Sequence, residues 1–127
     1  MKYGFSKSVN MLFDAAVEKV TAELQKEGFG VLTTIDVQAT LKKKLNADFK
    51  KYTILGACNP PFAQKALQAE EEIGLLLPCN VIVYEKGGQS VVAAFDPMSM
   101  MKVTDNPVIE PIAAEVKKRL ERVIAAM

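Results

Sequence analysis

The spacing of hydrophobic residues changes along this chain, and that change constrains the fold more than any other feature of the sequence. Over 8–27, and again from Asn106 to the C-terminus, hydrophobic residues recur every three or four positions, as they do on one face of an α-helix. Elsewhere, short runs rich in β-branched and aromatic residues predict strands. These runs cover 2–6, 29–35, 52–58, 81–85 and 90–95.

Boundary signals complete the predicted order of elements. Asp36 is placed to cap a short helix over 37–45. Asn59-Pro60 predicts a further helix that runs to about Glu72, because Asn favours the cap and Pro favours the first helical position. The pair Gly87-Gly88, between the last two predicted strands, favours a tight hairpin turn.

The predicted order alternates strands and helices and ends in two adjacent strands and a helix. This order predicts an α+β fold, a two-layer sandwich in which helices cover one face of a mostly antiparallel sheet. The chain has 127 residues and contains neither an internal repeat nor a linker-like segment. We therefore expect a single domain over 1–127.

The predicted strands carry hydrophobic residues on both faces of the sheet. A sheet that is apolar on both faces needs a second cover, which a homodimer or a bound ligand would supply. The set expected to face the helices of the same chain contains Phe29, Val31, Ile54, Val81, Val83, Val91, Ala93 and Phe95. The alternate set contains Leu32, Leu55, Ile82, Tyr84 and Val92.

Histidine is absent from the sequence, and this absence excludes several classes of function. A Ser-His-Asp or Cys-His nucleophile cannot be built within the chain, and neither can a histidine metal site. Two cysteines are too few for a four-cysteine zinc site. Thioethers such as Met98 and Met101 bind Cu(I), but we expect these methionines to fill gaps in the core. No metal and no cofactor are predicted.

The charges of the chain limit its partners. The formal net charge is +1, and Arg119 and Arg122 are the only arginines, so we expect no nucleic-acid binding. No segment has the pattern of a signal peptide or of a transmembrane helix, which predicts a cytoplasmic protein without membrane association. Lysines at 42–44 and 50–51 are typical of a solvated helix face.

Cys58-Asn59-Pro60 lies where a predicted strand meets a predicted helix. The amino end of a helix offers free N–H groups and a positive dipole, and both favour a thiolate over a thiol. Cys58 is therefore a candidate reactive thiol, and the Asn59 amide is a candidate helix cap and ligand-binding group. The competing interpretation is a small buried residue beside an ordinary helix cap.

Pro78-Cys79-Asn80 forms a second block at the start of a predicted strand. Cys79 shares a strand face with Val81, so its plain interpretation is a core residue. If the strands that contain Cys58 and Cys79 run antiparallel, the two thiols lie near each other. If a right-handed crossover makes these strands parallel, the thiols lie at opposite ends and cannot be bridged. The sequence leaves both arrangements open.

Several segments around the two cysteine blocks resemble the domain of unknown function 302 (DUF302) family. They lie at 28–33, 35–37, 52–60, 63, 66–67 and 74–81. The resemblance covers nearly the whole chain and implies a small bacterial or archaeal protein of TATA-binding-protein-like architecture, often dimeric, without an established enzymatic activity. It also implies that the surroundings of Cys58, Asn59, Pro60, Pro78, Cys79 and Asn80 are the family's defining site.

Three functions remain open at this point. The first is a homodimeric module that binds a small molecule or an anion at Cys58, Asn59, Pro60, Cys79 and Asn80. The second is a thiol-dependent redox protein or enzyme, with Cys58 as the nucleophile and Cys79 as a further candidate catalytic residue. The third is a structural assembly module whose cysteines belong to the core. The sequence does not decide whether the protein is an enzyme.

Overall fold

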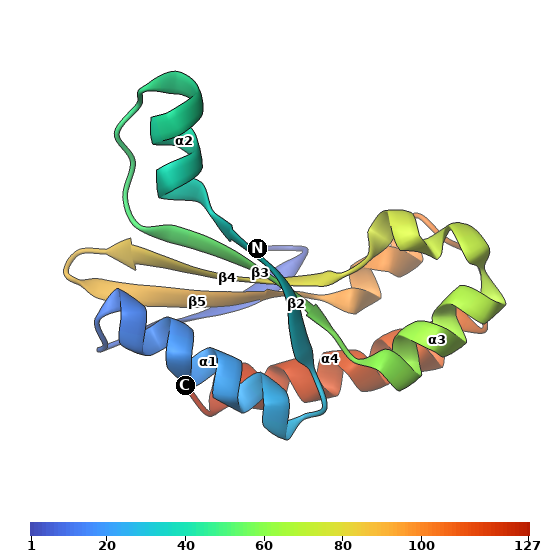
Figure 1. The fold of residues 1–127 in the computed structure, drawn as a ribbon. Helices are drawn as coiled ribbons and strands as arrows, with labels where there is room; N and C mark the ends of the chain where they lie inside the picture. Colours follow the sequence, from blue (N-terminus) through green and yellow to red (C-terminus); the bar gives the residue numbers. More distant parts are fainter.

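The computed structural model describes residues 1–127 and shows an α+β fold (Figure 1). Five strands alternate with four α-helices and two short 3₁₀ helices. In chain order the elements are β1 (Gly4–Val9), α1 (Phe13–Lys26), β2 (Gly30–Asp36), α2 (Val37–Leu45), β3 (Tyr52–Cys58), α3 (Pro60–Ala69), η1 (Glu71–Leu76), β4 (Cys79–Lys86), β5 (Gln89–Phe95), η2 (Pro97–Lys102) and α4 (Ile109–Ala125).

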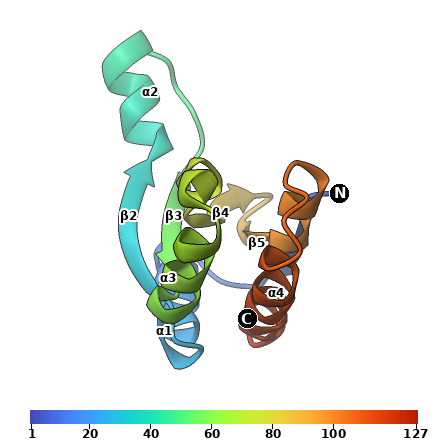
Figure 2. The same cartoon turned by 90° about the vertical axis from the view of Figure 1, so that its right-hand side faces the viewer.

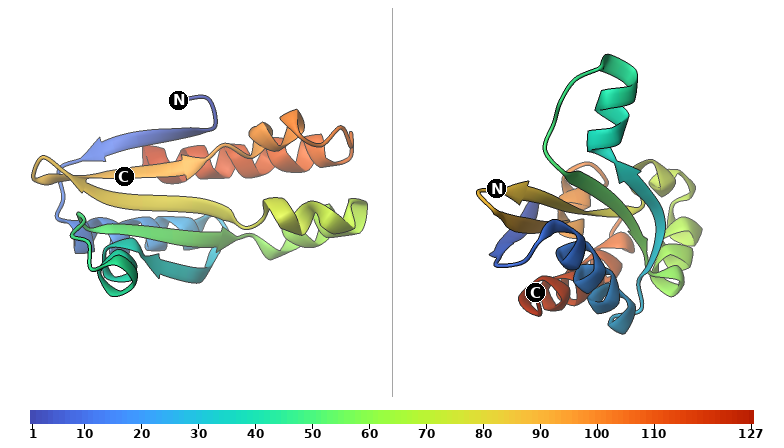
Figure 3. Two further views of the ribbon diagram at one scale, coloured as in Figure 1. Left: turned by 90° about the horizontal axis from the view of Figure 1, so that it is seen from above. Right: turned by 60° about the vertical axis from the view of Figure 1, so that its left-hand side comes forward.

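The strands form one sheet in the order β1-β5-β4-β3-β2, and every neighbouring pair is antiparallel. Helices α1 and α4 lie side by side on one face of this sheet (Figures 1 and 3). Their hydrophobic stripes, which include Val20 and Leu24 in α1 and Leu120 in α4, are fully buried against the strands. The predicted α+β sandwich with helices on one face is confirmed.

Pairing between strands corrects the predicted division of side chains between the two faces. Leu55 lies opposite Val81, and Val83 lies opposite Val92, so all four face α1 and α4 and are buried. Ile54, Val91 and Ala93 lie instead on the face that these helices leave uncovered, contrary to the prediction. Alternation is interrupted in β2, where an irregularity between Val31 and Thr33 shifts the pairing with β3. In the other strands alternation holds, but the pairing register depends on residues that are distant in the sequence, and it decides which residues share a face.

The uncovered face, which we call the open face, is apolar. Cross-strand neighbours on it are Ile35 with Ile54, Ile54 with Ile82, Ile82 with Ala93, and Tyr52 with Tyr84. The rings of Tyr52 and Tyr84 are stacked, with centroids 5.4 Å apart. The prediction of a sheet that is apolar on both faces is therefore confirmed. The chain covers the open face only in part, with Phe49 beside the Tyr52 ring and Lys50 over the Tyr84 ring.

Helix α2 stands away from the rest of the molecule on the side of the open face (Figures 1 and 2). None of its residues is buried. The Asp36 carboxylate accepts a hydrogen bond of 2.9 Å from the Ala39 N–H, which confirms the predicted cap. We refer to α2 and the following segment to Lys51 as the α2 arm. Because β3 joins the arm to α3, the arm and the α3–η1 region lie at opposite ends of the sheet (Figure 3).

Two predicted helix boundaries were wrong. Strand β1 pairs with β5 along its whole length, from Gly4 to Val9, so Ser8 belongs to the strand and α1 begins only at Phe13. Helix α3 ends at Ala69 rather than near Glu72, because Glu70 has an extended backbone conformation. The free Ala69 carbonyl accepts a hydrogen bond from the Asn106 side chain. No helix of the structure is both long and apolar enough to cross a membrane.

Candidate functional site

The two cysteines lie at the same end of the sheet. Strands β3 and β4 are antiparallel, and Ala57 is the cross-strand partner of Cys79. Cys58 is the residue after Ala57, so the two cysteines are close in space. Of the two arrangements that the sequence left open, the antiparallel one is therefore present. Both thiols are free. Cys79 is buried on the helix-covered side with Ala57, whereas Cys58 is only partly buried.

A small apolar cavity, which we call the thiol pocket, lies where the cysteine end of the sheet meets α3, α4 and η2. Its volume is about 50 Å³, and a single buried water needs roughly 10–15 Å³ of such volume. The pocket therefore has room for a molecule the size of a few waters. Its walls are Ala57, Cys58, Asn59, Phe62, Ala63, Ala66, Leu77, Pro78, Cys79, Pro97, Met100, Ile109, Ile112, Ala113 and Val116.

Only some of the predicted site residues meet in this pocket. Cys58, Asn59 and Cys79 line it. Pro60 is exposed and lines an open groove along α3 that Cys58 also borders. Asn80 is exposed at a separate groove of the open face, beside Tyr52. The two cysteine blocks therefore come together at Cys58, Asn59, Pro78 and Cys79, while Pro60 and Asn80 face other surfaces.

The amino end of α3 does not provide the anion site that the sequence suggested. Pro60 and Pro61 occupy its first two positions, and proline has no backbone N–H. The Asn59 side chain makes no capping hydrogen bond to the helix, which corrects the predicted cap. The Asn59 amide nitrogen instead donates to the Glu27 carbonyl, 3.2 Å away. Few donors remain at this helix end for a bound anion.

The thiols are also held in their neutral form. Burial raises the pKa of the Cys58 thiol. Burial, with a smaller contribution from the nearby Cys58, raises the pKa of Cys79 to about 11. The predicted stabilisation of a thiolate at Cys58 is therefore not supported, because burial disfavours the charged form of the thiol.

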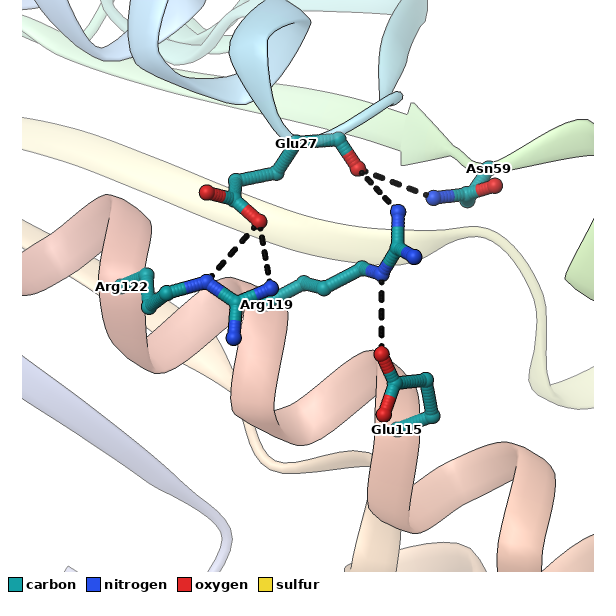
Figure 4. Close-up of polar contacts among 5 residues, drawn as sticks. All are labelled: Glu27, Asn59, Glu115, Arg119 and Arg122. Carbon is teal, nitrogen blue, oxygen red and sulfur yellow. Dashed lines mark hydrogen bonds and ion pairs between the residues drawn. The ribbon is translucent and has the colours of Figure 1, made fainter.

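Glu27 joins three parts of the fold beside the thiol pocket (Figure 4). Its carbonyl oxygen accepts hydrogen bonds from Asn59 and from Arg119, at 3.2 and 3.0 Å. Its carboxylate accepts two hydrogen bonds from Arg122, at 3.0 and 2.7 Å. The Arg122 guanidinium lowers the pKa of the Glu27 carboxyl. We call these four residues the Glu27 hub; it fastens the end of α1 and the start of α3 to α4.

The hub also shapes a wall of the thiol pocket. The Arg119 guanidinium lies over the Phe62 ring at 5.0 Å from its centroid, and it forms an ion pair with Glu115 at 3.2 Å. Phe62 is one of the pocket's walls, so Arg119 positions it without entering the pocket. Sequence reasoning missed Glu27 and the roles of both arginines. The available signal was that the only two arginines lie one turn apart on one helix.

No group of three or more His, Cys, Asp or Glu side chains is placed to hold a metal ion. Met100 lines the thiol pocket and packs with Ile73 and Ile109 in a second, smaller hydrophobic cluster. Met98 and Met101, the two methionines predicted to fill gaps in the core, are partly buried and pack against this smaller cluster.

Comparisons with known proteins agree on one family. The model of the family described as domain of unknown function DUF302 matches residues 5–127. The fold is similar to the crystal structure of an uncharacterized conserved DUF302 protein from Bacillus stearothermophilus. That similarity has a TM-score of 0.90 at 28% sequence identity, and it covers 98% of each chain. No curated protein matches the sequence.

Proposed function

We propose, for a chain that belongs to the DUF302 family, that it is a homodimeric module that binds a small uncharged molecule in the thiol pocket. The single observation that carries this proposal is the pocket itself. It brings both cysteine blocks to one apolar cavity between the sheet, α3, α4 and η2. Concave, largely apolar cavities with a few polar groups are the usual form of small-molecule sites.

The lining of the pocket supports an uncharged ligand over an anion. Most of the walls are hydrocarbon side chains, both thiols are neutral at physiological pH, and Pro60 and Pro61 remove backbone donors. An anion would lose its hydration shell there without sufficient replacement. Cys79, Cys58 and the Asn59 amide are the polar groups that could orient a neutral ligand.

The open face supports the homodimer. Ile54 and Ile82 are neighbours on its central strands, and exposed apolar patches mark interaction sites in folded proteins. Two copies of one chain that meet through this face would each bury the other's open face. Sedimentation of the purified protein measures this directly, and we expect the mass of two chains.

Ligand binding is tested by filling the pocket. Thermal-shift and NMR titrations use a panel of small uncharged compounds, with phosphate and acetate as anionic probes. We expect hits among the uncharged compounds that Ala113→Val abolishes, because the added methyl groups occupy the pocket that Ala113 lines. Ala114→Val is the matched control, since Ala114 is the next residue of α4 and does not line the pocket.

A second filling variant, Ala63→Val, covers the case in which Ala113→Val fails to fold. Ala63 lines the same pocket from α3 and is only partly buried. Equal binding by the wild type and both filled variants would sink the proposal. Hits confined to phosphate or acetate would replace the uncharged ligand by an anion.

A thiol-dependent redox or enzymatic role has less support, because a nucleophilic cysteine needs a lowered pKa and the pKa of Cys58 is raised. A purely structural assembly module would also be a homodimer, but it would bind no ligand in the pocket. The same titration therefore distinguishes a structural module from a ligand-binding one. A cytoplasmic location agrees with two free cysteines.

A further inference from the structure

We propose that the α2 arm of each protomer docks along α3 and η1 of its partner, so that two arms clasp the homodimer. This inference rests on the homodimer of the proposed function and adds the surface that sets its geometry. It starts from the arm's isolation: α2 has no buried residue and projects from the side of the open face (Figure 1).

Two limiting orientations of a two-fold axis bring one open face onto the other, and they carry the arm to different places on the partner. A two-fold axis across the strands brings the arm to the opposite end of the partner's sheet, where α3 and η1 lie (Figure 3). An axis along the strands brings the arm to the partner's β1 edge at the same end. Strand β4 ends at that end in Lys86, which would repel a lysine-rich arm.

The arm carries a combination of charge and exposed hydrocarbon. Lys43 and Lys44 are exposed and have no acidic partner within the chain. Leu45, directly after them, is 71% exposed, and Phe49 keeps 42% of its surface exposed although its ring lies 6.2 Å from that of Tyr52. A solvated helix face explains the lysines but not the neighbouring hydrocarbon, which is typical of a helix that packs against a partner.

The α3–η1 region presents the complementary combination. Glu71 and Glu72 are exposed and likewise have no basic partner within the chain. Leu67 and Leu75 are 41% and 84% exposed. Leu67 and Glu71 border the groove along α3 that also reaches Cys58. In the proposed dimer, the lysines and exposed leucine of the arm therefore meet the glutamates and exposed leucines of the partner's α3–η1 region. Opposite charges across an interface are what electrostatic complementarity requires.

Charge reversal and its repair test the clasp in the full-length protein. The measurement is the dimer dissociation constant by sedimentation equilibrium at low and high salt. We expect Lys43→Glu/Lys44→Glu and Glu71→Lys/Glu72→Lys each to raise that constant about tenfold at low salt. The variant with all four reversals should return toward the wild-type constant, because each arm again meets opposite charge on its partner.

Two control variants, Lys26→Glu/Lys118→Glu and Glu18→Lys/Glu121→Lys, reverse the same number of charges on helices α1 and α4. Each should leave the dimer dissociation constant within about twofold of wild type. If the wild type is a dimer and neither double reversal changes its dissociation constant, the proposed docking of the arm is wrong, although the homodimer remains. The same conclusion follows if the variant with all four reversals does not recover the wild-type constant. A monomeric wild type overturns both. Binding to vesicles that contain phosphatidylglycerol, lost on Lys43→Glu/Lys44→Glu without a change in mass, would assign the arm to an anionic lipid surface instead.

Discussion

At the scale of single residues, the Cys79 thiol contributes to stability with a sign that depends on pH. Its pKa is raised from 9.0 to about 11, so above pH 9 the unfolded chain loses a proton that the folded chain retains. Stability is therefore complete below pH 9 and falls as pH rises toward 11. Two pKa units correspond to about 2–3 kcal/mol for this largely buried group.

We expect Cys79→Ala to flatten this alkaline loss, although the variant starts from a lower stability because it leaves a small void. Urea unfolding at several pH values between neutrality and pH 11 measures both effects. An alkaline slope of the same size in Cys79→Ala would assign the loss to other groups.

Gly56 provides a second prediction at the residue scale. A Cβ at this position would overlap the Thr33 hydroxyl and approach Pro78 Cγ to 2.9 Å. Gly56→Ala should therefore destabilise the protein by about 1–3 kcal/mol. Gly30→Ala is the matched control, since nothing lies within 4 Å of an added Cβ there. Chemical denaturation compares the two, and equal losses would contradict the predicted overlap.

At the scale of elements, Arg119 holds the start of α3 and the end of α1 against α4. Arg119→Ala removes a hydrogen bond to the Glu27 carbonyl, the contact with the Phe62 ring and the pair with Glu115. We expect a loss of about 1–3 kcal/mol in the free energy of unfolding. Lys118→Ala changes the adjacent exposed residue and should stay within about 0.5 kcal/mol of wild type. Similar unfolding midpoints for the two variants would show that the hub does not fasten α4.

The elements were largely predictable from sequence, because hydrophobic period and cap residues act locally. The order of strands and helices along the chain and the Asp36 cap follow from such signals. The extent of β1 does not, because its end is set by pairing with β5, about eighty residues away in the chain. The face assignment of Ile54 and Val91 failed for the same reason: register belongs to pairs of strands, not to either strand alone.

The candidate site was predictable only in part. Both cysteine blocks stood out, and the structure brings Cys58 and Cys79 to one end of the sheet. The environment that sets their chemistry was not visible, since burial decides the pKa of each thiol and burial arises from α3, α4 and η2 together. The Glu27 hub depends on a main-chain carbonyl, an acceptor that every residue has and no side-chain pattern reveals.

At the scale of the whole molecule, the open face governs assembly. Ile82 lies on its central strand and is partly buried within one chain. In the proposed homodimer, Ile82→Glu would place a carboxylate in an apolar interface at a cost of several kcal/mol, so we expect a folded monomer. Val103→Glu is the control: Val103 directly follows η2, lies outside the sheet and is 73% exposed, so the variant should leave the mass unchanged. Sedimentation and circular dichroism separate dissociation from unfolding, and a dimeric Ile82→Glu would rule out this face as the interface.

The engagement of both arginines by Glu27 and Glu115 has a consequence for the chemistry of the molecular surface. Outside those contacts, every side-chain cation is a lysine. An ammonium group attracts an anion as a point charge, without the two-pronged geometry of a guanidinium, and it can be neutralised by acetylation. Acetyl transfer could therefore erase most of the positive surface, including that of the α2 arm, while the hydrogen bonds of the Glu27 hub stay in place.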